Sequence, residues 1–328
     1  MKELICLGIE STSHTFSVGI VNSTGKILAN EKSMLIPKLG SGFIPNEMFD
    51  HHVEVARNVL SKALNSAKLD LSDVNCIAFS QGMGIPNSLR VGASIARYLA
   101  LKYKKPLVGV NHAIGHIEIG KLTTDAKDPV IVYLSGGNSQ IIAFSNGRYR
   151  IFGETMDIPI GNALDVLARG LGLKMPGGPD IEKLAVGGKY IELPYSVKGM
   201  DLSFTGVTTE AINKYKSGIS EKDIAYSFQE TCFSMLTEVT ERAVAHIGKN
   251  EVLLVGGVAA NKRLQGMMHV MCRERSAKFF VVDNKYSGDN GSMIAWAGLL
   301  AYKTGTIVNV SSSSIKQKWR TDEAEIFY

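Results

Sequence analysis

The sequence predicts an α/β protein of two pseudo-symmetric lobes, each with a mixed β-sheet and helices, and a cleft between the lobes. An internal repeat supports this prediction. Residues 4–9 form a strand-like run that enters a polar turn at 10–14, and residues 130–134 enter a similar turn at 135–139. Each copy continues through two more strands, which are joined by a turn that contains Asn and Gly. A repeated supersecondary unit indicates a duplicated architecture.

Both halves next contain a helical segment. In the first half, apolar residues recur at helical spacing at Val53, Ala56, Val59, Leu60, Ala63 and Leu64. In the second half they recur at Ile224, Phe228, Cys232, Met235, Leu236 and Val239. Spacings of three and four residues place such side chains on one face of an α-helix, so we expect one such helix in each half.

Two short strands complete each half. They lie at 76–79 and 107–110 in the first half and at 252–255 and 279–282 in the second. A glycine-containing turn follows the earlier strand of each pair, and polar residues and a helix follow the later one. We therefore expect an N-terminal lobe at 1–126 and a nucleotide-binding lobe at 127–303, with a tail from about 304 to 328 that packs back on the first lobe.

Length and composition agree with two folded lobes. The chain has 328 residues, of which 45% are hydrophobic and 20% are charged, enough to bury two ordinary cores. No apolar run reaches membrane-spanning length, and the first strand begins too early for a signal peptide. Four cysteines occur without paired spacing, at Cys6, Cys76, Cys232 and Cys272. We expect a cytoplasmic protein with reduced cysteines and no membrane partner.

The charge balance is mildly basic. A net charge of +5 is compatible with RNA binding, but nucleic-acid affinity depends on local Lys and Arg clusters. Candidate clusters lie at 102–105, 262–263, 273–278 and 316–320. Clusters of this kind are more often solvated faces than binding sites.

A pair of histidines is the strongest chemical signal in the first half. His112 and His116 follow the strand at 107–110 directly. If a helix begins there, the two side chains lie on one face, about 5–6 Å apart at Cβ, which suits one metal ion. Capping and packing histidines are the alternative, and the position at the end of a repeated strand favours the metal.

The equivalent loop of the second half offers a carboxylate. Asp289 lies between the strand at 279–282 and the apolar helix at 293–300, so it can approach the same cleft from the other side. Tyr133, at the end of a repeated strand, can supply an oxygen as a fourth ligand. The alternatives are that Asp289 only caps its helix and that Tyr133 is only a strand aromatic.

One residue argues against a zinc-protease helix. That motif requires a glutamate directly after its first histidine to activate water, and this sequence has Ala113 there.

Three glycine-containing turns in the second half point to a nucleotide ligand. Residues 135–139 form a hairpin turn whose free backbone N–H groups can hold phosphate oxygens, and residues 256–261 lead from a strand into a helix start. The turn at 176–179 permits close backbone approach, with Glu182 one helical turn beyond it to bind ribose hydroxyls. Asp165 can serve the same purpose. A single glycine turn is usually only a turn, so the prediction depends on all three.

Ordered motifs along the whole chain resemble a known family. The motifs are Gly8-Ile-Glu-Ser-Thr12, Asn111-His-Ala-Ile-Gly-His116, Val132-Tyr-Leu-Ser-Gly-Gly-Asn-Ser-Gln140, Gly153-Glu-Thr-Met-Asp157, Pro176-Gly-Gly-Pro179, Asp201-Leu-Ser-Phe-Thr-Gly206, Gly256-Gly-Val-Ala-Ala-Asn261 and Asp289-Asn-Gly291. The lobes resemble the actin, Hsp70 and sugar-kinase (ASKHA) superfamily. Within it, the motifs resemble the universal tRNA threonylcarbamoyltransferases, the TsaD/Kae/Qri group once described as O-sialoglycoprotein endopeptidases.

Three details resemble the archaeal and eukaryotic branch of that family, which works in the KEOPS complex. They are His14, the run that starts at Tyr133, and the tail motif at 319–323. The branch usually ends this tail with a tryptophan, whereas this chain has Tyr328.

The resemblance implies roles for individual residues. It implies metal ligation by His112, His116, Tyr133 and Asp289. It implies binding of a nucleotide or of threonylcarbamoyl-adenylate by Tyr133, Leu134, Ser135, Gly136, Gly137, Asn138, Asp165, Gly178, Glu182 and Asn261. Glu10 and His14, on the opposing loop of the first lobe, are secondary catalytic candidates, with a structural role in the turn as the alternative.

The implied activity is transfer of the threonylcarbamoyl group from threonylcarbamoyl-AMP to the adenosine 3′ of the anticodon in tRNAs reading ANN codons. The implied cofactor is one divalent metal ion, iron or zinc, although ligands of this kind also fit manganese. The implied partners are tRNA and KEOPS subunits, in particular a small Bud-type protein kinase, in some members fused to the chain, and the dimerising Pcc-type subunit. An actin-type ATPase switch and a nucleotide-binding scaffold are the alternative functions. Histidines at 112 and 116 are poor ligands for the Mg²⁺ of such a switch.

Overall fold

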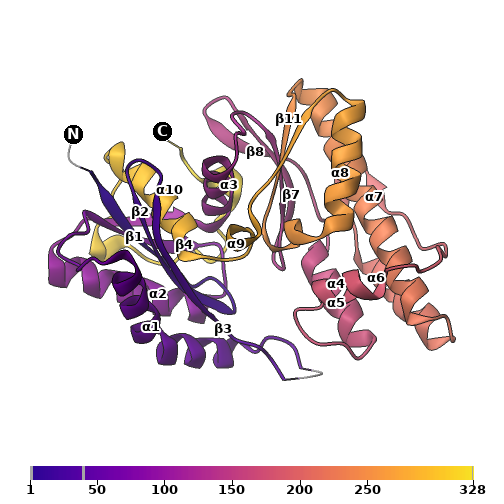
Figure 1. Cartoon of the computed structure of the whole chain (residues 1–328), viewed down its shortest axis with the longest axis horizontal. Helices are drawn as coiled ribbons and strands as arrows, with labels where there is room; N and C mark the ends of the chain where they lie inside the picture. Colours follow the sequence, from indigo (N-terminus) through magenta and orange to yellow (C-terminus); the bar gives the residue numbers. More distant parts are fainter. Residues whose placement is uncertain (1–2, 39–40, 327) are drawn as a thin grey trace.

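Two five-stranded mixed sheets form the centre of the two lobes (Figure 1). The computed structural model describes residues 3–38, 41–326 and 328. The first sheet has the order β3-β2-β1-β4-β5. Its strands are β1 (Ile5–Glu10), β2 (Thr15–Asn22), β3 (Ile27–Met34), β4 (Cys76–Gly82) and β5 (Leu107–Asn111). β1 pairs antiparallel with β2 and parallel with β4, as a hairpin followed by a helical crossover requires.

The second sheet repeats this arrangement. Its order is β12-β11-β6-β7-β8, which is the order of the first sheet read from the other edge. Its strands are β6 (Val130–Leu134), β7 (Ser139–Ser145), β8 (Arg148–Glu154), β11 (Glu251–Val255) and β12 (Lys278–Val281). β6 pairs antiparallel with β7 and parallel with β11, as β1 does with β2 and β4. The predicted α/β fold with duplicated mixed-sheet lobes is confirmed.

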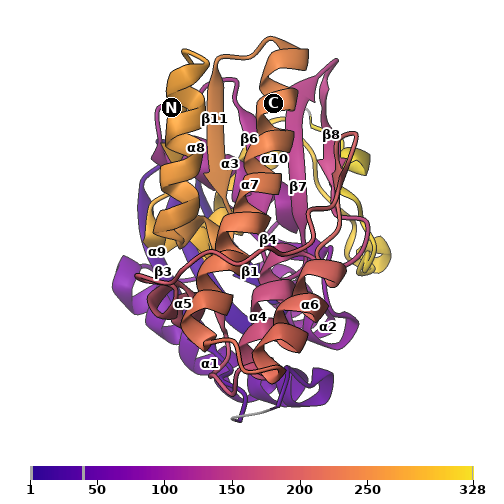
Figure 2. The ribbon, with the colours of Figure 1, turned by 90° about the vertical axis from the view of Figure 1, so that its right-hand side faces the viewer.

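Helices cover both sheets. Those of the first half are α1 (Pro45–Ala67), α2 (Pro86–Tyr103) and α3 (His112–Thr123). Those of the second half are α4 (Ile160–Gly170), α5 (Gly178–Leu184), α6 (Thr205–Lys216), α7 (Glu221–Ile247), α8 (Lys262–Glu274), α9 (Asn284–Ser287) and α10 (Gly291–Lys303). A small two-stranded sheet joins β9 (Val197–Lys198) to β10 (Asp201–Leu202). Figure 2 shows α7 and α8 lying over the second sheet. Within the described ranges, no helix is both long enough and apolar enough to cross a membrane.

The two predicted amphipathic helices form, with one difference. In α7 the whole predicted stripe is buried in the core of the second lobe. In α1 the buried face contains Ala56, Val59 and Ala63 as expected, but Val53 is 56% exposed. His52 is buried instead and lies edge-on against Phe16 of the sheet, so the start of α1 turns a different side to the core.

Helix α10 packs on the sheet of the first lobe, although the repeat predicts that it belongs to the second lobe. α10 lies against β1 and β2, where an added Cβ at Gly8 would be 2.2 Å from the backbone N of Ala295 and one at Gly19 would be 2.1 Å from that of Ser292. The absence of side chains at these two glycines lets the helix backbone rest directly on the first sheet. We therefore propose that α10 belongs to the first lobe, although the expected division at residue 303 places it in the second.

The C-terminal tail was expected to pack on the first lobe. It contacts the first lobe and the second lobe as well. Val308 bridges to Leu107 of β5, and the backbone N of Lys316 donates to the carbonyl of Gln81 near the end of β4 (2.7 Å). Farther along, the hydroxyl of Thr321 donates to Oε1 of Gln140 on β7 (2.9 Å). The tail therefore crosses from the first sheet to the second.

Candidate metal centre and nucleotide cleft

The start of α3 brings two imidazoles together. β5 ends at Asn111, whose side-chain oxygen accepts hydrogen bonds from the backbone N of Ala113 (3.0 Å) and of Ile114 (3.4 Å). This N-cap fixes His112 as the first residue of the helix, so His116 lies one turn later on the same face. The two rings have centroids 4.7 Å apart and both side chains are buried.

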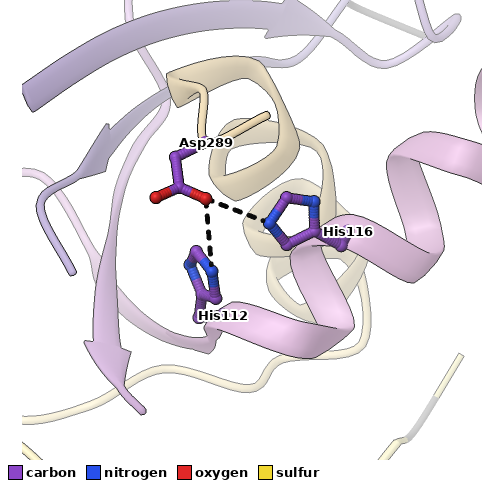
Figure 3. Close-up of side chains that lie close together, drawn as sticks. All are labelled: His112, His116 and Asp289. Atoms are coloured by element: carbon purple, nitrogen blue, oxygen red, sulfur yellow. Dashed lines mark hydrogen bonds and ion pairs between the residues drawn. The ribbon is translucent and has the colours of Figure 1, made fainter. Parts of the chain in front are cut away.

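Asp289 reaches the same point from the loop between α9 and α10. Its Oδ1 lies 3.5 Å from Nε2 of His112 and 3.3 Å from Nε2 of His116 (Figure 3). The N-cap of α10 is Asn290, whose Oδ1 accepts from the backbone N of Met293 (3.0 Å). Asp289 therefore does not cap the helix, which removes the structural alternative for this carboxylate.

The three side chains fit a divalent metal ion. One ligand atom from each lies within 4.8 Å of the others. Two imidazole nitrogens and one carboxylate oxygen suit zinc, iron and manganese, and three protein ligands leave further coordination positions for substrate or water. Burial lowers the pKa of His116, which favours the neutral imidazole that binds metals.

The electrostatics around His112 show why a cation suits this place. Burial lowers the pKa of His112, but the carboxylates of Glu10 and Asp289 outweigh that effect and raise it to about 9. Burial raises the pKa of Asp289, yet the two imidazoles hold it well below its usual range. Without another cation, a proton on His112 balances the two carboxylates, and a divalent cation can take the place of that proton.

Glu10 lies behind His112 and not on the cleft surface. It is fully buried, and its Oε2 is 3.0 Å from Nδ1 of His112. Its other oxygen accepts from the backbone N of Thr12 (2.6 Å), so the carboxylate is fixed in position. With Nδ1 held by Glu10, Nε2 of His112 is directed toward Asp289. Carboxylates commonly orient metal-binding histidines in this way.

Tyr133 lies beside the same centre, beneath the cleft. Its ring centroid is 5.2 Å from that of His116, and its hydroxyl accepts a hydrogen bond from the amide of Asn138 (3.5 Å). Burial raises the pKa of its hydroxyl. Leu134, which follows it, is a fully buried strand residue and does not line the cleft, in contrast to its expected role in nucleotide binding.

A cavity of about 870 Å³ opens above this centre, with walls from both lobes. His112 and Asp289 lie in its lining, together with most of the predicted nucleotide-binding residues. The latter are Ser135, Gly136, Gly137, Asn138, Asp165, Gly178, Glu182 and Asn261. The predicted interlobe cleft is thus present and is large enough for a nucleotide with a second ligand.

The hairpin turn at residues 135–138 differs from the prediction in one respect. Oγ of Ser135 accepts hydrogen bonds from the backbone N of Gly137 (3.2 Å) and of Asn138 (3.0 Å). The sequence suggested that these N–H groups are free, and the structure shows that they are not. Of the three N–H groups at 136–138, only that of Gly136 donates no hydrogen bond within the described part of the chain.

Asp165 and Gly177 meet where α4 approaches α5, one residue before Gly178. Oδ1 of Asp165 accepts from the backbone N of Gly177 (2.7 Å), and an added Cβ at Gly177 would be 2.2 Å from that of Ala168. This is the close backbone approach that the glycines at 176–179 predict. Burial raises the pKa of Asp165.

Glu182 and Asn261 line the cavity but also have structural partners. Oε1 of Glu182 accepts from the backbone N of Lys262 (2.6 Å) at the start of α8. Asn261 caps that helix through the backbone N of Leu264 (3.1 Å) and donates to Gln229 (2.8 Å). Both side chains therefore hold the start of α8 against the cleft.

The cavity walls contain residues that sequence reasoning missed, most of them in the first lobe. His14 lines the cavity as expected, but its ring stacks on that of Phe43, which the sequence analysis did not single out. Lys32 of β3 and Arg169 of α4 line the cavity as well. One sequence feature could have indicated Phe43 as a site residue. It is an aromatic residue in a glycine-containing loop, just before the proline that begins α1.

Comparisons with a family model and with known sequences agree on one family. A family model described as "TsaD: tRNA N6-adenosine threonylcarbamoyltransferase" matches residues 26–296. A relative named tRNA N6-adenosine threonylcarbamoyltransferase, from Thermococcus sibiricus, is 57% identical over 98% of this chain and 99% of its own length. A protein of the same name from Archaeoglobus fulgidus is 53% identical over 98% of this chain and 99% of its own length.

The chain is also similar to a longer relative and to two solved structures. The probable bifunctional tRNA threonylcarbamoyladenosine biosynthesis protein of Methanothermobacter thermautotrophicus is 51% identical over 98% of this chain, which spans 60% of that protein. The crystal structure of HypF from T. kodakarensis superposes with a TM-score of 0.64 at 16% identity, over 92% of this chain and 48% of that longer one. The activator of the 2-hydroxyisocaproyl-CoA dehydratase from Clostridium difficile superposes with a TM-score of 0.57 at 14% identity, over 94% of this chain and 99% of that one. At these identities the two structures support the fold alone.

Proposed function

The chain belongs to the tRNA N6-adenosine threonylcarbamoyltransferase family, in its archaeal form, and from this premise we propose how its cleft carries out the transfer. The proposed reaction moves the threonylcarbamoyl group from threonylcarbamoyl-AMP to the adenosine 3′ of the anticodon in tRNAs reading ANN codons. The observation that carries the proposal is the convergence of His112, His116 and Asp289 at one edge of a cavity shared by both lobes.

In the proposed reaction, the exocyclic N6 of the adenosine attacks the carbamoyl carbon. The new N–C bond forms as the C–O bond to the phosphate breaks, AMP leaves with the electron pair, and N6 loses a proton. A divalent metal ion held by His112, His116 and Asp289 would supply stabilisation of negative charge on the carbamoyl oxygen or the leaving phosphate. We propose Tyr133 as a further ligand, because its ring lies beside His116.

The second lobe is the proposed binding site for the adenylate. Gly136, Gly137 and Gly178 leave space next to the backbone, since an added Cβ would meet nothing within 4 Å at the first two and only Leu164, at 3.9 Å, at the third. Asp165 and Glu182 are the proposed partners of the ribose hydroxyls. Positioning of the amine against an already activated carbonyl supplies much of the proposed rate enhancement.

Glu10 has a different proposed role from the catalytic one that the sequence suggested. Because it is fully buried and contacts His112 through Nδ1, we propose it as a positioning residue for that ligand. His14 does line the cavity, and its proposed role follows in the next subsection.

The proposed metal is iron or zinc, with manganese also compatible with the ligands. The proposed partners beyond tRNA are a Bud-type kinase and a Pcc-type subunit of a KEOPS complex. The existence of longer bifunctional relatives, of which this chain spans 60%, supports a partner that can be fused to it. The proposed place of action is the cytoplasm, in keeping with a tRNA substrate and with four free, buried cysteines.

The direct test is incubation of the protein with synthetic threonylcarbamoyl-AMP and tRNA, first alone and then with the partner subunits. We expect one modified adenosine per tRNA and release of AMP, both measured by mass spectrometry of nucleosides and nucleotides. In a parallel incubation with ATP, an ATPase switch would instead release ADP without modifying tRNA, and a scaffold would do neither.

A further inference from the structure

The first-lobe wall of the cleft carries an aromatic pair that the metal and nucleotide sites do not use. The rings of His14 and Phe43 have centroids 4.4 Å apart and planes inclined by only 25°. Both residues line the cavity and both are half-buried. The pair therefore presents ring surface to the cavity. Thr12, two residues before His14, contacts Nδ1 of His112 through its hydroxyl (3.3 Å), so the pair lies next to the proposed reaction centre.

The two walls of the cavity differ in chemistry. On the second-lobe wall, Gly136, Gly137 and Gly257 have open space where a Cβ would be. A wall of exposed backbone suits phosphate and ribose groups. Met34 and Met83 of the first half add apolar side chains to the lining of the same cavity. Such a surface suits the face of a planar base.

Two cationic side chains line the same cavity as the aromatic pair. Lys32 and Arg169 line the cavity from opposite lobes, and both are exposed. Neither forms an ion pair with any residue in the described ranges. Arg169 lies close to the loop that carries Phe43, because an added Cβ at Gly42 would be 3.4 Å from its Nη1. Aromatic platforms flanked by cations are typical of sites that bind single-stranded nucleic acid.

We propose that Phe43, backed by His14, is the platform on which the acceptor adenine of the tRNA stacks, with Lys32 and Arg169 beside it for the neighbouring phosphates. This inference rests on the proposed function. Unpaired bases of RNA loops are commonly recognised by stacking on aromatic side chains. An anticodon-loop base can enter such a pocket without the opening of a duplex. The base would then lie between the aromatic wall and the adenylate, with its amine directed to the metal centre.

The test uses the full chain with its partner subunits and an anticodon stem-loop RNA that carries 2-aminopurine in place of the acceptor adenine. This base has no amine at C6, so it binds without reacting, and its fluorescence is quenched by stacking. We compare the wild type with Phe43→Leu and Phe43→Trp. Phe49→Leu, on an exposed part of α1 outside the cavity lining, is the matched control.

We expect quenching with the wild type, Phe43→Trp and Phe49→Leu, and little with Phe43→Leu. The KM for tRNA should rise at least about fivefold in Phe43→Leu, the lower end of the effect of losing one stacked base, while adenylate affinity stays unchanged. Unchanged quenching and KM in Phe43→Leu would overturn the inference while leaving the proposed function intact. Equal loss of adenylate affinity in the Leu and Trp variants would also overturn it, because Phe43 would then support the fold. Failure of the wild type to modify tRNA would overturn the proposed function, and this inference with it.

Discussion

Nδ1 of His112 lies 3.0 Å from Oε2 of Glu10, and both side chains are buried. The contact joins the first strand of the first sheet to the start of α3, two elements about a hundred residues apart in the sequence. It fixes which nitrogen of His112 faces the proposed metal. The proposed metal centre thus depends on a carboxylate that does not line the cleft.

This contact predicts the effect of changing Glu10. Glu10→Ala should weaken metal affinity by about 10- to 100-fold, because His112 loses the partner that orients it. Glu10→Gln should lose less, since its amide oxygen can still accept from Nδ1. Affinity is measured by competition with a chromophoric chelator. Glu47→Gln, on an exposed first-turn residue of α1, is the control and should match the wild type. Wild-type metal affinity in Glu10→Ala would contradict the positioning role.

Removal of a proposed metal ligand should lower metal affinity more than removal of Glu10 does. We expect His116→Ala or Asp289→Asn to lower tRNA modification by more than about 100-fold and to abolish stoichiometric metal binding, while adenylate affinity persists. Elemental analysis and nucleoside mass spectrometry measure the two effects on the same samples. His246→Ala, on the exposed side of α7, is the matched control. A metal-free variant with normal turnover would exclude metal-assisted transfer.

The fold was predictable because the internal repeat fixes the order of strands in both lobes. The close approach of His112 and Asp289 was also predictable, because equivalent loops of the two halves meet at one cleft. The sheet against which α10 packs was not. This helix is buried on most sides, so its apolar pattern does not distinguish the two sheets. The glycines at 8 and 19 indicate the side on which its backbone rests.

Details of local geometry in turns and loops also escaped the sequence. The N–H groups of the turn at 135–138 were expected to be free, yet Ser135 is placed to accept two of them. Phe43 lies in an irregular loop without periodicity, so no pattern indicated that it stacks on His14. In both cases the outcome depends on short-range geometry that residue spacing does not encode.

The packing of α10 makes a prediction about stability. Gly19→Ala should lower the free energy of unfolding by about 1–3 kcal/mol or more, because its Cβ would collide with the backbone at Ser292. Gly266→Ala in α8 is the matched comparison. Its Cβ would meet nothing within 4 Å, and alanine in a helix interior should add about 0.5–1 kcal/mol. Chemical denaturation of both variants provides the measurement. Equal stability of the two would show that α10 does not rest on the first sheet as described.

The last prediction concerns His52, a buried residue of α1. Its Nδ1 lies 3.2 Å from that of His51, and its Nε2 has no hydrogen-bond partner in the described part of the chain. Burial, together with the nearby imidazole of His51, lowers the pKa of His52 to about 4. The unfolded chain, with an ordinary histidine pKa of about 6.5, therefore binds a proton that the folded protein does not accept until the pH approaches 4. Stability should fall as the pH decreases through this window.

His52→Leu removes the titrating group and should flatten that part of the profile. Between pH 6.5 and pH 4, the wild type should lose up to about 3 kcal/mol more of its free energy of unfolding than the variant, because each unit of pKa shift corresponds to about 1.4 kcal/mol. Losses from carboxylates that become protonated are common to both proteins and cancel in the comparison. His269→Leu, an exposed position on α8, should retain the wild-type slope. Urea denaturation at half-unit pH steps gives the profiles. Parallel curves for the wild type and His52→Leu would show that His52 accepts its proton as readily in the folded state as in the unfolded chain.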